Sequence, residues 1–172
     1  METIESIDNQ PSLKQQRPSF LTVLCILTFI ATGWGVMTGF LGLFSAAPTD
    51  EIIQAQQLKI IILADELRTA NVEYLAGVID QFGLMQTEIF QNFKLHVLIT
   101  LFVSLIGLGG SLLMFKGKKL GFHLYIIYSI LSVISIYAVA SSSNISSFHI
   151  ITNISVSGIF ILMYSRNLKW LK

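Results

Sequence analysis

The chain has 172 residues, of which 53% are apolar and only 12% are charged, and its formal net charge is +1. A soluble globular domain carries about 25% charged residues, so this composition excludes an ordinary soluble fold and indicates a protein that crosses a membrane several times. The single cysteine, Cys25, excludes an intrachain disulfide and any metal site built from several cysteines.

The N-terminal part of the chain changes abruptly from polar to apolar. Residues 1–19 are polar and contain two prolines, and we expect them to form a flexible cytoplasmic tail. Residues 20–44 contain no Asp, Glu, Lys or Arg and predict the first transmembrane helix. A secretion signal that ends at Ala47 is the alternative. This apolar run exceeds the usual length of about 7–15 residues, and Pro48 disfavours cleavage, so we favour the helix.

Small residues form a stripe along the first predicted span, at every fourth position: Ala31, Gly35 and Gly39. Such a stripe lets another helix backbone approach closely. We favour packing within one subunit, against small residues of the second span such as Gly107 and Ser111, over a seam between two copies. Trp34 lies too deep in the span for an interfacial anchor, and we expect it to pack between helices.

Residues 45–94 hold seven of the ten acidic residues and predict an amphipathic helical segment on the external side. Thr49 or Asp50 can cap its start. One helix of about 45 residues would be about 68 Å long, so we expect two helices, broken at Gly77 or Gly83 and folded over the membrane surface. The apolar run from residue 60 to 63 is too short to cross a membrane, and we expect it to be buried within this helical segment.

Residues 95–115 and residues 120–140 predict the second and third spans, because neither run contains Asp, Glu, Lys or Arg. A helix of about 21 residues rises about 31 Å, which matches the hydrocarbon core of a bilayer. Between them, residues 116–119 form a turn with three lysines. Cationic loops are retained on the cytoplasmic side, so this turn sets the direction of both spans.

The serine-rich residues 141–147 predict an external turn, residues 148–165 the fourth span, and residues 166–172 a basic cytoplasmic tail. Both termini are then cytoplasmic. The residues that determine this topology are Lys116, Lys118, Lys119, Arg166, Lys169 and Lys172.

Few residues in the predicted spans offer chemistry. The absence of Asp, Glu, Lys and Arg there argues against a proton-coupled or ion-coupled transporter. His96 and His149 both fall near the external ends of spans and would bind a metal only with a third ligand such as Glu88, so we favour interfacial roles for them. Asn153 needs hydrogen-bond partners inside the membrane, and interhelical bonding is a commoner role for it than substrate contact.

No sequence motif for nucleophilic, metallohydrolase or nucleotide chemistry is present: the chain contains no G-x-S-x-G, H-E-x-x-H or Walker loop. We therefore expect no catalytic site, no cofactor and no nucleic-acid partner.

Two segments of the C-terminal half carry a resemblance. The first is K-K-L-G-F-H-L-Y at residues 118–125, and the second is N-L-K-W-L-K at residues 167–172. They resemble small uncharacterised four-pass bacterial inner-membrane proteins, which start their third helix with a similar K-K-x-G-F-x-L-Y and end in a short basic tail. The resemblance implies a bacterial inner membrane and supplies no activity.

The sequence thus predicts an all-α membrane protein of four transmembrane helices, with an amphipathic helical segment between the first and the second. We expect a non-enzymatic accessory or scaffold subunit that contacts the bilayer and either a membrane-protein partner or further copies of itself. A small channel or transporter for an uncharged or lipid-like substrate is the alternative, and a membrane-embedded enzyme comes third.

Overall fold

The computed structural model describes residues 18–172, so nearly all of the cytoplasmic tail predicted for residues 1–19 lies outside the described residues. Between residues 18 and 172 the chain forms six α-helices: α1 Ser19–Phe44, α2 Asp50–Thr69, α3 Glu73–Gln91, α4 Phe93–Phe115, α5 Leu120–Ile134 and α6 Ser147–Ser165. Short 3-10 helices follow α5 (Ser135–Ala138) and α6 (Leu168–Trp170). Four helical segments are long and apolar enough to cross a membrane: α1, α4, α5 with its 3-10 extension, and α6. The fold class predicted from the sequence is confirmed.

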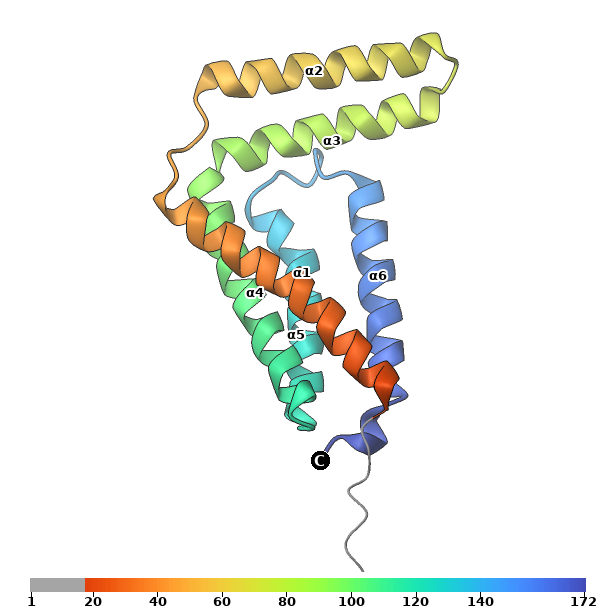
Figure 1. Cartoon of the computed structure of the whole chain (residues 1–172). Helices are drawn as coiled ribbons and strands as arrows, with labels where there is room; N and C mark the ends of the chain where they lie inside the picture. The colour runs from red at the N-terminus through yellow and green to blue at the C-terminus, as the bar shows by residue number, and fades with distance from the viewer. Residues whose placement is uncertain (1–17) are drawn as a thin grey trace, which may run out of the picture.

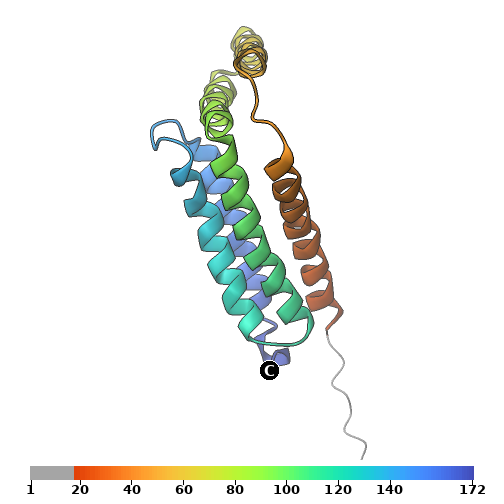
Figure 2. The same cartoon turned by 90° about the vertical axis from the view of Figure 1, so that its left-hand side faces the viewer.

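The helices divide into a bundle and an arm. Helices α4, α5 and α6 stand side by side, and α1 crosses them obliquely (Figure 1). Helices α2 and α3 form an antiparallel hairpin that lies across one end of the bundle, seen end-on in Figure 2. The C-terminus and the turn between α4 and α5 lie at the opposite end of the bundle. The hairpin and the basic turn are therefore separated by the length of the spans.

The face of α1 that packs on α4 is made of small residues. Three glycines contact α4: Gly35 lies against Ser104, Gly39 against Leu101 and Gly42 against Val97. A Cβ atom on Gly39 would lie 3.0 Å from the Leu101 Cα atom, so the two backbones leave no room for a side chain. The glycine stripe therefore serves packing within one subunit, and it does not lie free for a second copy.

Ala31 and Trp34 do not lie on this packed face. Both are exposed, and Trp34 retains 65% of its accessible surface. The packed face of α1 passes instead through Thr32, with its hydroxyl bonded to the Thr28 carbonyl at 2.7 Å. The expectation that Trp34 packs between helices is wrong, because its position on α1 turns the indole outward to the lipid.

Helices α4 and α5 approach closely beside the basic turn. A Cβ atom on Gly121 would lie 2.4 Å from the Met114 backbone nitrogen and 2.5 Å from the Gly110 carbonyl oxygen. Farther along α4, Gly107 lies against Thr32 of α1 and Tyr128 of α5. Glycine is thus required where three spans meet.

The main apolar core lies at the end of the bundle remote from the hairpin. Its buried members come from α1, α4, α5, α6 and the C-terminal segment, and they are Leu21, Leu24, Cys25, Met114, Phe122, Tyr125, Tyr164 and Leu171. Thr28 and Tyr164 share a buried hydrogen bond of 2.8 Å between their hydroxyls. This bond links α1 to α6 across the core.

The hairpin turns at Asn71 and not at Gly77 or Gly83, both of which lie inside α3. Asn71 has φ of 60°, and the amides of Asn71 and Val72 donate to the carbonyls of Arg68 and Leu67 at 2.9 Å. These two bonds satisfy the last carbonyls of α2 in the Schellman pattern, which asparagine enters at lower cost than most residues. The predicted break at a glycine was therefore wrong, whereas the division into two helices was right.

Candidate functional site

The end of the molecule that carries the hairpin is the richest in polar contacts and grooves among residues 18–172. Helix α2 begins at a capped turn, in which the Thr49 hydroxyl accepts a hydrogen bond from the Ile52 amide at 3.4 Å. Asp50 and Glu51 lie in its first turn, where their negative charges interact favourably with the positive end of the helix dipole. Residues next to one another in the sequence therefore determine where α2 begins.

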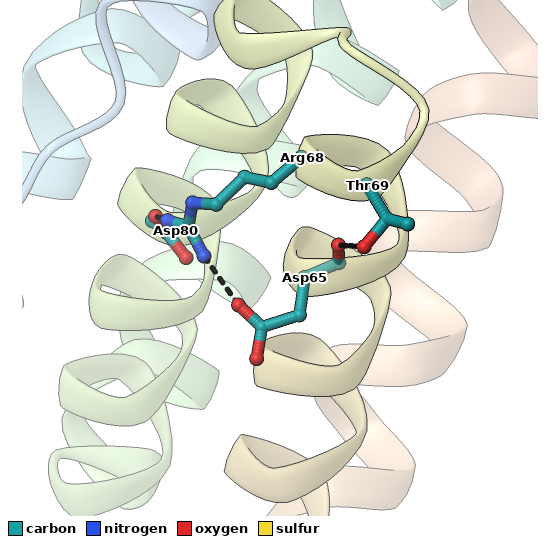
Figure 3. Close-up of polar contacts among 4 residues, drawn as sticks. All are labelled: Asp65, Arg68, Thr69 and Asp80. Atoms are coloured by element: carbon teal, nitrogen blue, oxygen red, sulfur yellow. Dashed lines mark hydrogen bonds and ion pairs between the residues drawn. The ribbon is translucent and has the colours of Figure 1, made fainter.

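One guanidinium bridges the two helices of the hairpin close to its turn. Arg68 of α2 donates to Asp65 at 2.7 Å on its own helix and also pairs with Asp80 of α3 (Figure 3). The hydrogen bond to Asp65, followed by the charge of Asp80, raises the pKa of Arg68. All three side chains are well exposed, so we read the cluster as a clamp on the hairpin and not as a binding site.

Two further contacts close the hairpin along its length. Gln57 Nε2 donates to Thr87 Oγ1 at 3.0 Å. A Cβ atom on Gly83 would lie 2.6 Å from the Ile60 side chain, so this glycine lets α3 pack directly on α2. Gly83 thus acts as a packing residue inside a helix, which explains why it does not break one.

The outer surface of the hairpin exposes apolar side chains. Of the run at residues 60–63, only Ile60 is half-buried, whereas Ile61, Ile62 and Leu63 are exposed. Leu58 is also exposed, at 58%. The expectation that this run is buried within the helical segment is wrong, because two helices provide only one buried interface and α2 contacts mainly α3.

Glu88, near the end of α3, ties the hairpin to the loop between α5 and α6. Its carboxylate accepts hydrogen bonds from the Ser141 amide, from the Ser141 hydroxyl at 3.0 Å and from Asn144 Nδ2 at 2.5 Å. These donors, the Ser141 amide foremost, lower the pKa of Glu88. The carboxylate that was considered as a third metal ligand is therefore committed to the serine turn.

Two side chains at the start of α4 fix its neighbours. Asn92 Nδ2 donates to the Val139 carbonyl at 2.9 Å. Lys94 Nζ donates to the carbonyls of Leu43 at 3.0 Å and Ser45 at 2.5 Å, at the C-terminal end of α1. A cation here satisfies free carbonyls and complements the helix dipole. Sequence reasoning assigned Lys94 only to the external segment, and no local pattern signals this capping role.

A groove of about 580 Å³ lies between the underside of α3 and the first half of α6. Val78, Ile79 and Phe82 of α3 form one wall. The other wall is formed by Ser146 and by the α6 residues Phe148, His149, Thr152, Asn153 and Val156. The groove was not foreseen, because its walls are about 70 residues apart in the sequence.

Two polar side chains of this groove differ in their bonding. Ser146 is 1% exposed, and its hydroxyl has no hydrogen-bond partner within the described residues. Asn153 Oδ1 accepts hydrogen bonds from Ser132 of α5 at 3.3 Å and from Ser157 at 3.5 Å. Asn153 therefore makes an interhelical contact with α5 through its side-chain oxygen.

The two histidines at the hairpin end of the bundle, His96 and His149, have different surroundings. His96 lies in a groove between α1 and α4 with its Nε2 atom 3.5 Å from Thr100 Oγ1, and His149 lines the groove between α3 and α6. No cluster of three or more His, Cys, Asp or Glu residues suited to a metal occurs in residues 18–172. The structure therefore does not assemble the metal site considered for His96 and His149.

The cationic residues of the topology pattern gather at the end opposite the hairpin. The Lys119 amide donates to the Lys172 carbonyl at 2.8 Å, and the Lys172 amide donates to the Gly117 carbonyl at 2.6 Å. Gly117 has φ of 78°, a conformation that glycine adopts without strain. The C-terminal tail is thus bound to the basic turn, and both lie at the end of the bundle opposite the hairpin.

The remaining predicted packing residue, Ser111, is fully buried in α4 and donates to the Leu108 carbonyl at 2.9 Å.

In comparisons with protein families, curated proteins and solved structures, none matches this chain. The chain is an integral membrane protein with four spans.

Proposed function

We propose that this protein is a non-enzymatic accessory or scaffold subunit of a bacterial inner membrane, and that its α2–α3 hairpin binds a partner on the external side. The observation that carries the proposal is the exposed apolar surface of α2, around Leu58 and Ile62, on an arm held clear of the spans. Apolar side chains exposed on a solvated arm are a feature of interaction surfaces.

The net charge of the hairpin indicates the kind of partner that it would bind. Helices α2 and α3, with their connection, hold seven acidic residues and two basic ones, a net charge of −5. Asp65 and Asp80 are paired with Arg68, whereas Glu51 and Glu66 make no ion pair in the described residues. We therefore assign the partner as a membrane protein whose external segment carries basic side chains around an apolar centre.

The topology follows from the position of the cations. Six Lys and Arg residues lie at the end of the bundle opposite the hairpin, and cationic ends are retained in the cytoplasm. This supports a cytoplasmic C-terminus and an external hairpin. Cysteine labelling of Lys118→Cys and of Thr49→Cys in intact cells tests the arrangement, and labelling of both from one side would refute it.

Co-purification in mild detergent tests the partner. We expect the partner to stay bound to the wild-type chain, to dissociate as ionic strength rises, and to be lost from the double variant Leu58→Gln, Ile62→Gln. The double variant Gln54→Ala, Gln56→Ala is the control, because both glutamines are exposed polar residues on the same helix. Retention of the partner by the Leu58, Ile62 variant would contradict the proposal.

A further inference from the structure

We propose that a basic cavity at the end of the bundle opposite the hairpin binds the phosphate group of an anionic phospholipid. This cavity, of about 370 Å³, is lined by Lys119, Phe122, His123, Leu168 and Lys169. The proposal goes beyond the scaffold role, because it concerns the opposite end of the molecule from the surface assigned to a partner protein. Three observations carry it: how the basic cavity is built, where it lies along the spans and which charges it holds.

Two segments far apart in the sequence build the basic cavity. The Lys119 amide donates to the Lys172 carbonyl at 2.8 Å, which ties the start of α5 to the C-terminal segment. Leu171 anchors that segment, because it is 2% exposed and belongs to the main apolar core. Retention of cations on one side of a membrane depends on their number and not on their mutual placement. Topology alone therefore does not explain why Lys119 and Lys169 line one cavity.

The basic cavity lies where the spans reach the lipid headgroups. Lys119 immediately precedes α5, and Lys169 lies in the 3-10 helix that follows α6. Trp170 is half-buried, with its ring centroid 5.9 Å from Lys169 Nζ, and tryptophan is typical of the membrane interface. Phe122 and Leu168 add an apolar part to the lining. A ligand that is charged at one end and apolar next to it suits such a cavity, and a phospholipid has this form.

The charge of the basic cavity favours a phosphate whose headgroup carries no cation. Lys119 and Lys169 make no ion pair within residues 18–172, where every acidic side chain lies between residues 50 and 88. His123 Nδ1 lies 3.1 Å from the Lys119 carbonyl oxygen, so this N–H donates to the backbone and holds the ring beside Lys119. The ammonium group of phosphatidylethanolamine would find no acidic partner here, whereas phosphatidylglycerol is anionic and needs none.

Native mass spectrometry of the full chain in mild detergent tests the site by titration with each of these two lipids. We expect the first phosphatidylglycerol to bind at least tenfold more tightly than the first phosphatidylethanolamine. The double variant Lys119→Gln, Lys169→Gln should lower the affinity for phosphatidylglycerol about 25-fold, because each basic residue near anionic lipid contributes about fivefold. Equal affinity for the two lipids, or an unchanged affinity in the double variant, would overturn the proposal.

A second pair of residues separates this cavity from general attraction by the basic end. The double variant Lys116→Gln, Arg166→Gln removes the same charge from two exposed residues that do not line the cavity, and it should keep the affinity within about twofold. Lys119→Arg, Lys169→Arg keeps both charges and should retain binding. An equal loss of affinity in the Lys116, Arg166 variant would show attraction by the whole basic end and would overturn the proposal.

A soluble phosphate ester is the other possible source of the phosphate group. Glycerophosphoglycerol carries the headgroup of phosphatidylglycerol without its acyl chains. We expect millimolar glycerophosphoglycerol to leave phosphatidylglycerol bound, because the soluble headgroup lacks the apolar part that Phe122 and Leu168 would contact. Displacement of the lipid by glycerophosphoglycerol at equal concentration would overturn the assignment to a lipid.

Discussion

The helices on the two sides of the molecule differ in how closely they pack. Helices α1, α4 and α5 pack on one another through glycines, whereas α6 joins them through larger side chains such as Tyr164, and the hairpin makes few contacts with the bundle. In the most apolar stretch of α4, 39% of the residues are buried, against 6% in α6. Gly158, the one glycine of α6, has nothing within 4 Å of the place where a Cβ atom would be. Close packing in this protein therefore follows the placement of small residues.

This difference shows where the stability of the bundle comes from. In a bilayer the hydrophobic effect does not drive spans together, so close packing and hydrogen bonds must do so. The glycine-lined side provides this packing. The side with α6 and the hairpin leaves apolar surface exposed, and polar contacts such as that of Glu88 fix the hairpin in place.

The largest difference between the two sides should appear when one methyl group is added to each. Gly121→Ala should destabilise the bundle by about 1–3 kcal/mol or more, because the new Cβ atom would overlap backbone atoms of Met114 and Gly110. Gly158→Ala should cost nothing, because that position is open. The measurement is the midpoint of thermal unfolding in detergent. Equal midpoints for the two variants would contradict the assignment of α4 and α5 to the closely packed side.

A smaller loss should follow from the removal of one buried hydroxyl. Tyr164→Phe deletes the bond to Thr28, and an interhelical hydrogen bond of this kind contributes about 0.6 kcal/mol. Tyr137→Phe is the matched control, because Tyr137 is 47% exposed. We expect a lower unfolding midpoint for Tyr164→Phe only. An unchanged midpoint would show that α6 joins the core by apolar contact alone.

The close packing of α1 on α4 could be predicted from the sequence, and the contacts of the hairpin could not. Uncharged runs of sufficient length indicate four spans, and the spacing of Gly35 and Gly39 indicates a close helix contact. Ala31 was wrongly expected on the packed face of α1. Positions spaced strictly by four rotate gradually around a helix, whereas the residues that contact α4 alternate in steps of three and four. The local pattern therefore places the stripe on α1, whereas two of its contacts on α4 are with the larger residues Leu101 and Val97.

The contacts of the hairpin escaped prediction because they join distant residues with no shared pattern. Glu88 finds its donors in a loop 53 residues away, and Lys94 finds its carbonyl acceptors at the end of α1, 51 residues away at Leu43. The turn at Asn71 was missed because glycine is the commoner signal for a left-handed residue. The groove between α3 and α6 depends on the angle of the hairpin, which no local pattern encodes.

The attachment of the hairpin should depend on pH through Glu88. Its pKa is lower in the folded state, so the stabilisation by Glu88 is complete above the ordinary carboxyl pKa and is lost as the pH falls through the folded-state value. Hydrogen exchange of residues 141–146, corrected for intrinsic rates, should therefore increase in acid. Glu88→Gln should show increased exchange already at neutral pH, whereas Glu73→Gln, also on α3, should not. Exchange independent of both pH and Glu88→Gln would mean that apolar contacts alone hold the hairpin.

The smallest effect is expected at the tip of the hairpin, where Arg68 joins α2 to α3. Because Arg68, Asp65 and Asp80 are exposed, solvent and salt screen their attraction, and Arg68→Gln should leave the unfolding midpoint unchanged. Hydrogen exchange should rise only around the turn at Asn71, and the difference should disappear at high salt. Lys59→Gln removes a cation that makes no ion pair in the described residues and should change nothing. A lower midpoint for Arg68→Gln would contradict this expectation. It would show that the hairpin and the bundle unfold as one cooperative unit, because loss of a contact at the tip of the hairpin would then destabilise the whole protein.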